Sequence, residues 1–502
     1  MRGETDAPFR SRGVTSGFAA GIASRALRFL TNLLLARAII LEFGAGRWGV
    51  LALSWAVTDL VFIGDFAIHE VALYQAAASS TREGVRRALD QVLLLSVLPA
   101  ALGTVALLVC SAAARAGVLF RADYAGPTLS GLFLAAAASY PVLIATKVYV
   151  GTLQGLGWVR ELNLWALGAL LLDFAVVMGG LRFGLDIVTI QWGRAALAPV
   201  ALVLLLWTLR RLRLPVAAPG RPDRGTIRLL LRYAVGYNVN RGLGTAVASV
   251  NAPIAQFFVP AAALGTFGAA DQWASKVRKF TDVAWESFYH RFVHCLRDGA
   301  SAEDREAGRL QFLAVSLAIN LLLVPTGVVL ILASPWIFRV WLNAQAAALP
   351  LALLPGLVAA WTLNASCSPL TWVLLAANRF RASARLHLVV VAANVALTVA
   401  LTSSRGITGT VEAMVTSALV LAMLLSVAAC RVVGTSWLRW AASNAAPYAV
   451  AACAILWSRA SSAAWTPVAA GALSVGASIA IGLRARSFRA VRDMLRKPAG
   501  AE

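Results

Sequence analysis

The sequence predicts an all-α polytopic membrane protein with about fourteen transmembrane helices, and three observations lead to this prediction. Of the 502 residues, 59% are hydrophobic and only 14% are charged, and the mean hydropathy is +0.74. The apolar residues form runs of about 20, the length that an α-helix needs to cross a bilayer. The arginines and lysines behind the net charge of +22 gather in alternate connections between these runs. This balance excludes a soluble enzyme, a disordered chain and a fibrous protein.

The apolar runs can be placed one after another along the chain. Segments of about ten residues with alternating polarity, which a transmembrane β-barrel requires, do not occur. The expected spans are 14–40, 47–74, 91–113, 128–152, 161–182, 186–208, 228–253, 261–289, 309–333, 348–377, 384–403, 407–431, 438–458 and 464–484.

Turn-forming residues separate several of these runs. Short polar turns are expected at Arg182–Asp186 and Ser403–Gly406. Glycines at Gly44–Gly46 and prolines at Pro127 and Pro350 stand at other boundaries, where helix breakers belong.

Arginine and lysine in the connections on one side outnumber those on the other side by about fourfold. The side that contains both chain ends is the basic one. The positive-inside rule therefore places both termini in the cytoplasm. The basic charge is explained by topology, and no nucleic-acid partner is expected.

The longest connection, residues 210–228, is basic, contains two prolines and divides the chain after six helices. We expect a six-helix lobe over 12–212, a second six-helix lobe over 226–432, and two extra helices over 436–485. Six helices in each half predict parallel repeats, related by a pseudo-two-fold axis along the membrane normal.

A weak internal repeat supports this division. The segment 43–55 aligns with 263–273, and each lies at the outer connection between the first two helices of its half. The aligned positions are Gly46 with Gly265, Trp48 with Phe267, and Gly49 with Gly268.

Charged and amide side chains within the spans point to a hydrated cavity, because charge in the membrane is costly and usually faces water or a partner. The first helix of each half carries such a group, and one lysine lies in the fourth helix. Guanidinium forks match phosphate oxygens, so an anionic head group is expected rather than an organic cation. We expect no acidic residue among the cations that bind the head group. The expected substrate-binding residues are Arg25, Arg28, Asn32, Lys147, Asn238, Asn240 and Arg241.

The second helix contributes two carboxylates, Asp59 and Asp65, which we expect to serve in ion coupling. A proton could bind there when substrate phosphate competes for nearby cations. The alternative that the first-helix arginines simply pair with acids of the second helix stays open.

Motifs for other chemistry are missing from the sequence. The five cysteines stand far apart with no metal-ligand spacing, so no metal or cofactor is expected. No P-loop occurs, so ATP is not expected as the direct driver. The expected outer connections are short and carry no acidic pair, which disfavours a membrane glycosyltransferase or polymerase. The protein is not expected to be an enzyme.

Residues 24–68, "SRALRFLTNLLLARAIILEFGAGRWGVLALSWAVTDLVFIGDFAI", resemble the opening of the polysaccharide-repeat (O-antigen type) flippases. That opening has a helix ending in "LLLAR", a short "FG" turn, and a "DFG"-like turn, which here is Asp65-Phe66-Ala67 without the glycine. The second half, from "LLRYAVGYNVN" to "FGAADQW", is also similar, but Val250-Asn251-Ala252 stands where these proteins commonly hold an acidic-basic pair.

The resemblance implies a flippase of the multidrug/oligosaccharidyl-lipid/polysaccharide exporter superfamily in a bacterial inner membrane. Its substrate would be an undecaprenyl-pyrophosphate-linked oligosaccharide, moved from the inner to the outer leaflet by alternating access. Membrane lipids, a polysaccharide polymerase and glycosyltransferases are the implied partners. A flippase for the lipid-linked peptidoglycan precursor, to which "SRALRF" is similar, and a cation-coupled multidrug exporter are alternatives with the same fold.

Overall fold

The computed structural model describes residues 14–65, 67–79, 81–214, 249–278, 301–342, 344–460 and 466–484, with isolated positions inside 239–247 and 281–296. All regular structure in these residues is helical, which confirms the predicted all-α class. Nine helical segments among them are long and apolar enough to cross a membrane. The chain is therefore a multi-pass membrane protein.

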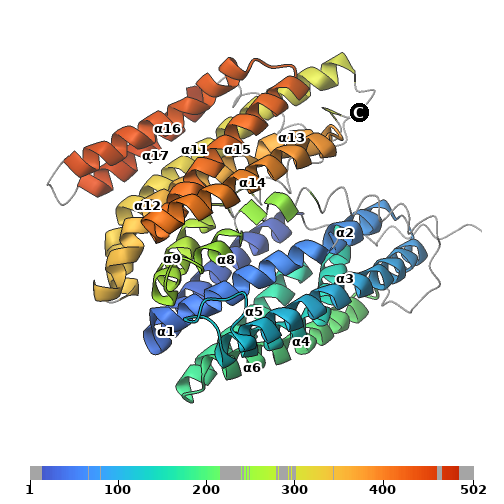
Figure 1. Cartoon of the computed structure of the whole chain (residues 1–502). Helices are drawn as coiled ribbons and strands as arrows, with labels where there is room; N and C mark the ends of the chain where they lie inside the picture. Colours follow the sequence, from blue (N-terminus) through green and yellow to red (C-terminus); the bar gives the residue numbers. More distant parts are fainter. Residues whose placement is uncertain are drawn as a thin grey trace, which may run out of the picture. The chain divides into compact units, whose positions relative to one another are not determined.

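The chain forms two compact units, residues 1–265 and 266–502. The first unit (Figure 1) contains long helices from α1 to α6, the short α8, and the first residues of α9. Its elements are α1 (Val14–Phe62), the 3-10 turn η2 (Ile63–Asp65), α2 (Ile68–Ala78), α3 (Arg82–Ala116), α4 (Pro127–Gly155), α5 (Val159–Arg182), α6 (Ile187–Arg211), α8 (Asn251–Ala255) and α9 (Ala261–Ala274).

Helix boundaries in the first unit follow local sequence chemistry. Gly44, at φ 79° and ψ 166°, interrupts α1 within the expected glycine turn. Pro127 is the first residue of α4, where its missing N–H costs no helical hydrogen bond. The Asp186 side chain accepts hydrogen bonds from the Val188 and Thr189 amides at 2.8 and 3.1 Å and so caps α6. These expected boundaries are confirmed.

The second expected span, 47–74, is not one continuous helix. It ends at Phe62, passes through η2 and resumes as α2 at Ile68. Ala67, just before α2, has the left-handed backbone conformation at φ 53° and ψ 38°. The break therefore falls at the "DFG"-like turn, and alanine occupies the left-handed position where the resembled pattern has glycine.

Two glycines allow α4 to pack closely in the first unit. A Cβ on Gly151 of α4 would overlap the carbonyl oxygen of His69 in α2. A Cβ on Gly103 of α3 would overlap the Tyr140 ring of α4. Near Gly151, apolar residues of α2, α3, α4 and α6 form one buried cluster. This packing fixes α4 against both the helix break and α3.

A contact within the first unit has a local two-fold character. A Cβ on Gly49 would overlap the carbonyl oxygen of Ala261, and a Cβ on Gly265 would overlap that of Ala45. Two small residues four apart on each segment thus allow the backbones to touch, as in transmembrane helix pairs. In this contact, Gly49 and Gly265 occupy equivalent positions. The sequence alignment instead pairs Gly46 with Gly265, so the two registers differ by three residues.

The second unit is also helical. The predicted turn after Ser403 is confirmed between α14 and α15. Pro350 lies inside α12 rather than at its start, so the expected boundary there is wrong; α12 already begins at Ala344. The helices are α11 (Ala302–Trp341), α12 (Ala344–Ser366), α13 (Ser368–Ala376), α14 (Phe380–Arg405), α15 (Ile407–Val432), α16 (Trp437–Ala460) and α17 (Thr466–Arg484).

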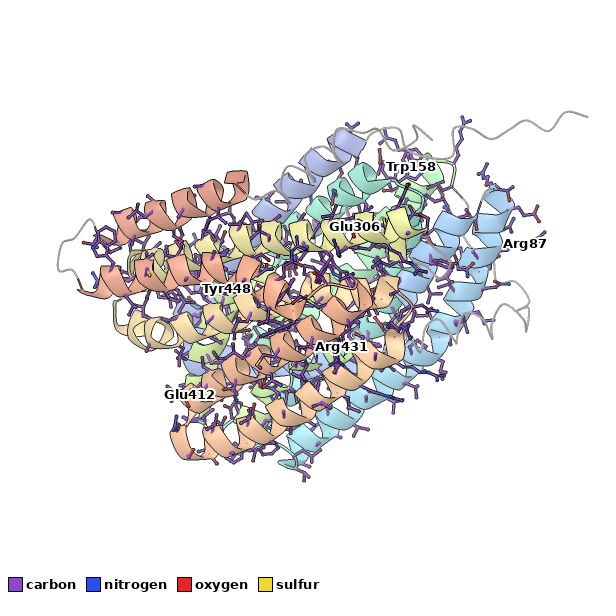
Figure 2. All side chains as sticks on the ribbon, turned by 90° about the horizontal axis from the view of Figure 1, so that it is seen from above. Arg87, Trp158, Glu306, Glu412, Arg431 and Tyr448 are labelled. Carbon is purple, nitrogen blue, oxygen red and sulfur yellow. The ribbon has the colours of Figure 1, made fainter. Side chains whose placement is uncertain are left out.

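The two C-terminal helices of the second unit, α16 and α17, pack along α11 (Figure 1). Their apolar contact includes Val324 and Ala454. A polar chain crosses the same interface: Asn320 donates to Asn444 at 2.7 Å, and Tyr448, labelled in Figure 2, contacts Ser366 of α12 at 2.7 Å. These hydrogen bonds fix the register of α16 on its neighbours.

Candidate functional site

The candidate site begins at the helix break of the first unit. Asp65 is fully buried, and its Oδ1 accepts a hydrogen bond from the Ala67 amide at 2.9 Å. A broken transmembrane helix leaves backbone groups without helical partners, and such breaks commonly line transport sites. The Asp65 carboxylate satisfies one of those groups, so this side chain helps to hold the break in shape.

Asp65 is paired with the lysine of α4. Lys147 Nζ lies 2.6 Å from Asp65 Oδ2. The lysine side chain is 27% exposed, whereas the aspartate side chain is 0% exposed. We call these two residues the Lys147 pair. Its accessible end is the cation, and its carboxylate is wholly enclosed by protein.

Aromatic side chains surround the Lys147 ammonium. Nζ lies 4.1 Å from the ring centre of Phe62, at a distance typical of a cation–π contact. The Phe62 ring packs on Tyr140 with centroids 4.6 Å apart, and the Tyr140 hydroxyl donates to the Val61 carbonyl oxygen at 3.3 Å. The pair is therefore held by the last turn of α1 as well as by α4.

A histidine links α2 to the same stretch of α4. His69 Nδ1 lies 3.3 Å from the Lys147 carbonyl oxygen, and Nε2 lies 3.1 Å from Gln154 Oε1. Both ring nitrogens thus contact α4, directly over the close approach at Gly151. Among the described residues, no three His, Cys, Asp or Glu side chains form a metal site, and His69 belongs to a hydrogen-bonded helix contact.

A second ion pair lies between α5 and α6. Arg194 Nε and Nη2 donate to the two carboxylate oxygens of Asp173 at 2.7 and 3.1 Å, and Nη1 donates to Gln191 at 3.2 Å. The two charged side chains are 24% and 23% exposed, so both ends are accessible to the same degree. We call them the Arg194 pair.

One stripe of α1 connects the two pairs. The Arg194 guanidinium carbon lies 5.6 Å from the ring centre of Trp55, seven residues before Phe62. Residues seven apart lie on the same helix face, and seven residues span about 10 Å. Trp48, another seven residues back, packs edge-on against Trp55 at 5.4 Å. An aromatic face of α1 thus carries a cation at each of two depths.

The structure brings together only some of the predicted site residues. The sequence predicts substrate binding for Lys147 and ion coupling for Asp65, with no acid among the substrate-binding cations. This last expectation is wrong for Lys147, because Asp65 pairs with it. Asp59 is exposed on α1. The side chains of Arg25, Arg28, Asn32, Asn238, Asn240 and Arg241 lie outside the described residues.

Asp173 and Arg194 were missed, although the sequence holds a signal for them. They stand at similar separations from the turn between α5 and α6, one before it and one after it. A tight helical hairpin brings residues at equal distances from its turn to the same depth. Opposite charges at mirrored positions of two apolar runs therefore predict an intramembrane ion pair.

Comparison with known proteins establishes the fold. Neither a family model nor a curated protein matches the chain in sequence. The lipid II flippase MurJ in its inward closed conformation matches with a TM-score of 0.66 and 11% identity, covering 95% of this chain and 99% of that chain. An inward-facing MATE family multidrug transporter of the MOP superfamily matches with a TM-score of 0.61 and 14% identity, covering 82% and 96%.

A third solved structure is a MOP superfamily transporter from Pyrococcus furiosus, described with a reversed polarity of its binding pocket. It matches with a TM-score of 0.52 and 14% identity and covers 85% of this chain and 98% of that chain. The chain therefore has the fold of MOP superfamily transporters.

Proposed function

We propose that this protein is a flippase that moves an undecaprenyl-pyrophosphate-linked oligosaccharide from the inner to the outer leaflet of a bacterial inner membrane. The single observation that carries the proposal is the polarity of the Lys147 pair, whose exposed end is the ammonium. A site with this polarity attracts phosphate oxygens. An organic cation would instead require accessible carboxylates and aromatic faces.

The depth of Lys147 suits a head group in the inner leaflet. Lys147 stands twenty residues after Pro127, the first residue of α4. At 1.5 Å per residue this is about 30 Å, the thickness of the hydrocarbon core. In the proposed topology, with both termini cytoplasmic, the ammonium would lie near the inner boundary, where a diphosphate head group on a lipid would first meet it.

The fold supports a lipid substrate and alternating access. MOP-type halves rocking around a central cavity would expose the head group to each leaflet in turn, while the lipid tail stays in the bilayer. The lipid II flippase covers 95% of this chain, against 82% for the MATE transporter. The additional part of this chain that the lipid II flippase covers is longer than the stretch that holds α16 and α17. Coverage of this extent favours a lipid flippase over a drug exporter.

Ion coupling is the second part of the proposal. Because Asp65 binds Lys147 directly, an arriving diphosphate would compete with Asp65 for the ammonium. The displaced carboxylate could then take up a proton. Replacing Asp65 with Asn is expected to remove the proton dependence of transport, and the same replacement of Asp59 tests whether the second carboxylate takes part.

The lipid-linked peptidoglycan precursor remains the nearest alternative substrate, because it shares the diphosphate and the lipid. A membrane glycosyltransferase or polymerase would be a different class. Under the proposal, such enzymes are instead partners that make the lipid-linked repeat and consume it after transport.

The test is transport in proteoliposomes that contain a fluorescent polyprenyl-pyrophosphate-linked sugar, measured by its accessibility to an added sugar-cleaving enzyme. In the neutral variant Asp65→Asn/Lys147→Gln, hydrogen bonding at the helix break is kept but the cation is lost. In the exchanged variant Asp65→Lys/Lys147→Asp, the positions of the two charges are reversed. The Ala67 amide also loses its side-chain acceptor, so normal insertion is verified before transport is compared. We expect both to insert normally and to lose at least about 90% of transport, since a charged hydrogen bond is worth about 1.5–3 kcal/mol.

Replacement of the exposed ion pair near the start of α3, Glu83→Gln/Arg87→Gln, is the control, because both of its side chains are more than 70% exposed; Figure 2 labels Arg87. It should leave transport unchanged. Wild-type protein that transports a cationic dye but no diphosphate lipid would overturn the proposal. So would full transport by the exchanged variant.

A further inference from the structure

The Arg194 pair lies deeper in the membrane than is needed to hold the α5–α6 hairpin together. Arg194 stands seven residues after Ile187, the first residue of α6, which is about 10 Å along the helix. Charge at this depth is costly, and it usually faces water or a functional partner. The two side chains are each about one quarter exposed, so they are reachable from the protein surface.

The hairpin of α14 and α15 in the second unit offers an internal comparison. Its ion pair, Arg405 with Glu412 at 2.6 Å, lies at the turn and is largely exposed; Figure 2 labels Glu412 at the end of α15. Deeper in the same hairpin, Ser417 donates to Asn394 at 2.9 Å, and both are fully buried. A neutral hydrogen bond thus holds the α14–α15 hairpin together far from its turn. Joining two helices of a hairpin does not by itself require buried charge.

The Arg194 guanidinium is presented for a further contact. A guanidinium has five N–H donors. Three of them are used, two by Asp173 and one by Gln191, in the part of the chain that the structure describes. Two donors therefore remain on a group whose position is fixed from two sides and whose plane lies beside Trp55. A planar pair of donors held in this way suits phosphate oxygens.

We infer that Arg194 is a second contact for the diphosphate of the transported lipid, and that Asp173 is a positioning residue that holds Arg194 and limits its affinity. This inference rests on the proposed function. The head group would pass along the aromatic stripe of α1, from Phe62 to Trp55, over about 10 Å. Because Asp173 is as exposed as Arg194, it repels phosphate and weakens binding there. Weak binding at the second contact favours release rather than retention.

Four variants in proteoliposomes separate this role from a structural one. Arg194→Gln should lower transport of the fluorescent polyprenyl-pyrophosphate-linked sugar by about tenfold, the equivalent of one charged hydrogen bond. Asp173→Asn should also slow transport, yet it should tighten binding of farnesyl pyrophosphate, the soluble probe, by about threefold to tenfold. The exchanged variant Asp173→Arg/Arg194→Asp should fold and remain slow. Arg405→Gln/Glu412→Gln, at the other hairpin, is the matched control and should transport normally.

A purely structural role predicts a different pattern. If Arg194 only joins α5 to α6, the exchanged variant recovers transport, and Asp173→Asn leaves the affinity for farnesyl pyrophosphate unchanged; either result overturns the inference. If the Arg194→Gln variant transports the lipid as fast as the wild-type protein, the inference is overturned but the flippase function still stands. Wild-type protein that moves no diphosphate lipid overturns both.

Discussion

The Lys147 pair and the Arg194 pair are built from the same chemistry but differ in which charge can be reached. Each joins a basic residue to an aspartate inside the membrane, and each cation lies beside an aromatic ring of α1. In the Lys147 pair the aspartate is 0% exposed, whereas in the Arg194 pair both partners are exposed to a similar degree. The exposure of the acid, rather than the presence of a cation, therefore decides how strongly each site attracts an anion.

The backbones that carry the two pairs also differ. Gly151 of α4 contacts backbone, the carbonyl oxygen of His69, where no side chain can move aside. A Cβ on Gly180 of α5 would instead overlap the Ile190 side chain of α6. The α2–α4 contact beside Lys147 is thus limited by backbone, whereas the α5–α6 contact is limited by a side chain.

The largest expected difference between the two pairs follows from removing one cation at a time. Lys147→Met leaves a fully buried carboxylate without this partner, and losing one member of a buried pair costs about 3–5 kcal/mol. Arg194→Met leaves Asp173 partly accessible to water, so its cost should be well below this. Thermal unfolding in detergent measures both. The double variant Asp65→Asn/Lys147→Met, which keeps an acceptor for the Ala67 amide, should recover most of the stability. Equal losses for the two single variants would contradict the comparison.

A smaller effect is expected from glycine replacements on the helices that carry Lys147 and Asp173. Gly151→Ala forces α2 and α4 apart, and overpacking of this kind costs about 1–3 kcal/mol. Gly168→Ala on α5, where a Cβ meets open space, should instead stabilise its helix by up to about 1 kcal/mol. Gly151→Ala should also reduce transport, because it displaces the segment that carries Lys147. A Gly151→Ala variant as stable as Gly168→Ala would show that the α2–α4 contact is not rigid.

The sequence predicted the fold more completely than the site. Runs of apolar residues and their breakers are local signals, so Gly44, Pro127 and Asp186 marked real helix boundaries. The expected span 47–74 runs through the break at 63–67 because the same apolar pattern continues there, and only the resemblance indicated a turn at Asp65-Phe66-Ala67. The Asp65 side chain, which accepts a hydrogen bond from the Ala67 amide, holds this break. The expected boundary at Pro350 is wrong for a different reason: a proline in an otherwise apolar run can lie inside a helix when the tertiary packing accommodates it.

The partners of charged residues could not be predicted from their own surroundings in the chain. Lys147 and Asp65 are 82 positions apart, and only the packing of α4 against the break brings them together. Nothing near either residue specifies the other, which is why they were given separate roles. Asp173 and Arg194 are different, because the hairpin turn between them fixes their common depth. Symmetry about a tight turn is the one signal that could have revealed an ion pair in advance.

The helix break beside the Lys147 pair contains a correctable strain. Ala67 has a left-handed conformation, which costs a non-glycine residue about 1–2 kcal/mol. Ala67→Gly removes that strain but adds chain entropy to the unfolded state, so we expect a net gain below about 1 kcal/mol. Ala76→Gly, in the helical part of α2, has no strain to relieve and should be destabilised by about 0.5–1 kcal/mol. Thermal unfolding in detergent compares the two, and a loss of stability in Ala67→Gly would mean that the break is not strained.

The smallest effect belongs to the start of the helix that carries Arg194. Hydrogen bonds, chiefly from the Thr189 side chain, hold the pKa of Asp186 below its usual value. A lowered pKa means that the ionised cap stabilises the first turn of α6 above the ordinary aspartate pKa of about 3.9, and that this contribution is lost as the pH falls below it. Asp186→Ala should therefore speed amide hydrogen exchange at Val188 and Thr189 at neutral pH, by a factor that corresponds to about 0.5–1 kcal/mol. The difference should shrink toward pH 3, after correction for intrinsic exchange rates. Because Asp186 is exposed and Arg194 is seven residues further along, transport should change little; a large loss would mean that the Arg194 pair depends on its helix terminus rather than on Asp173 and Gln191.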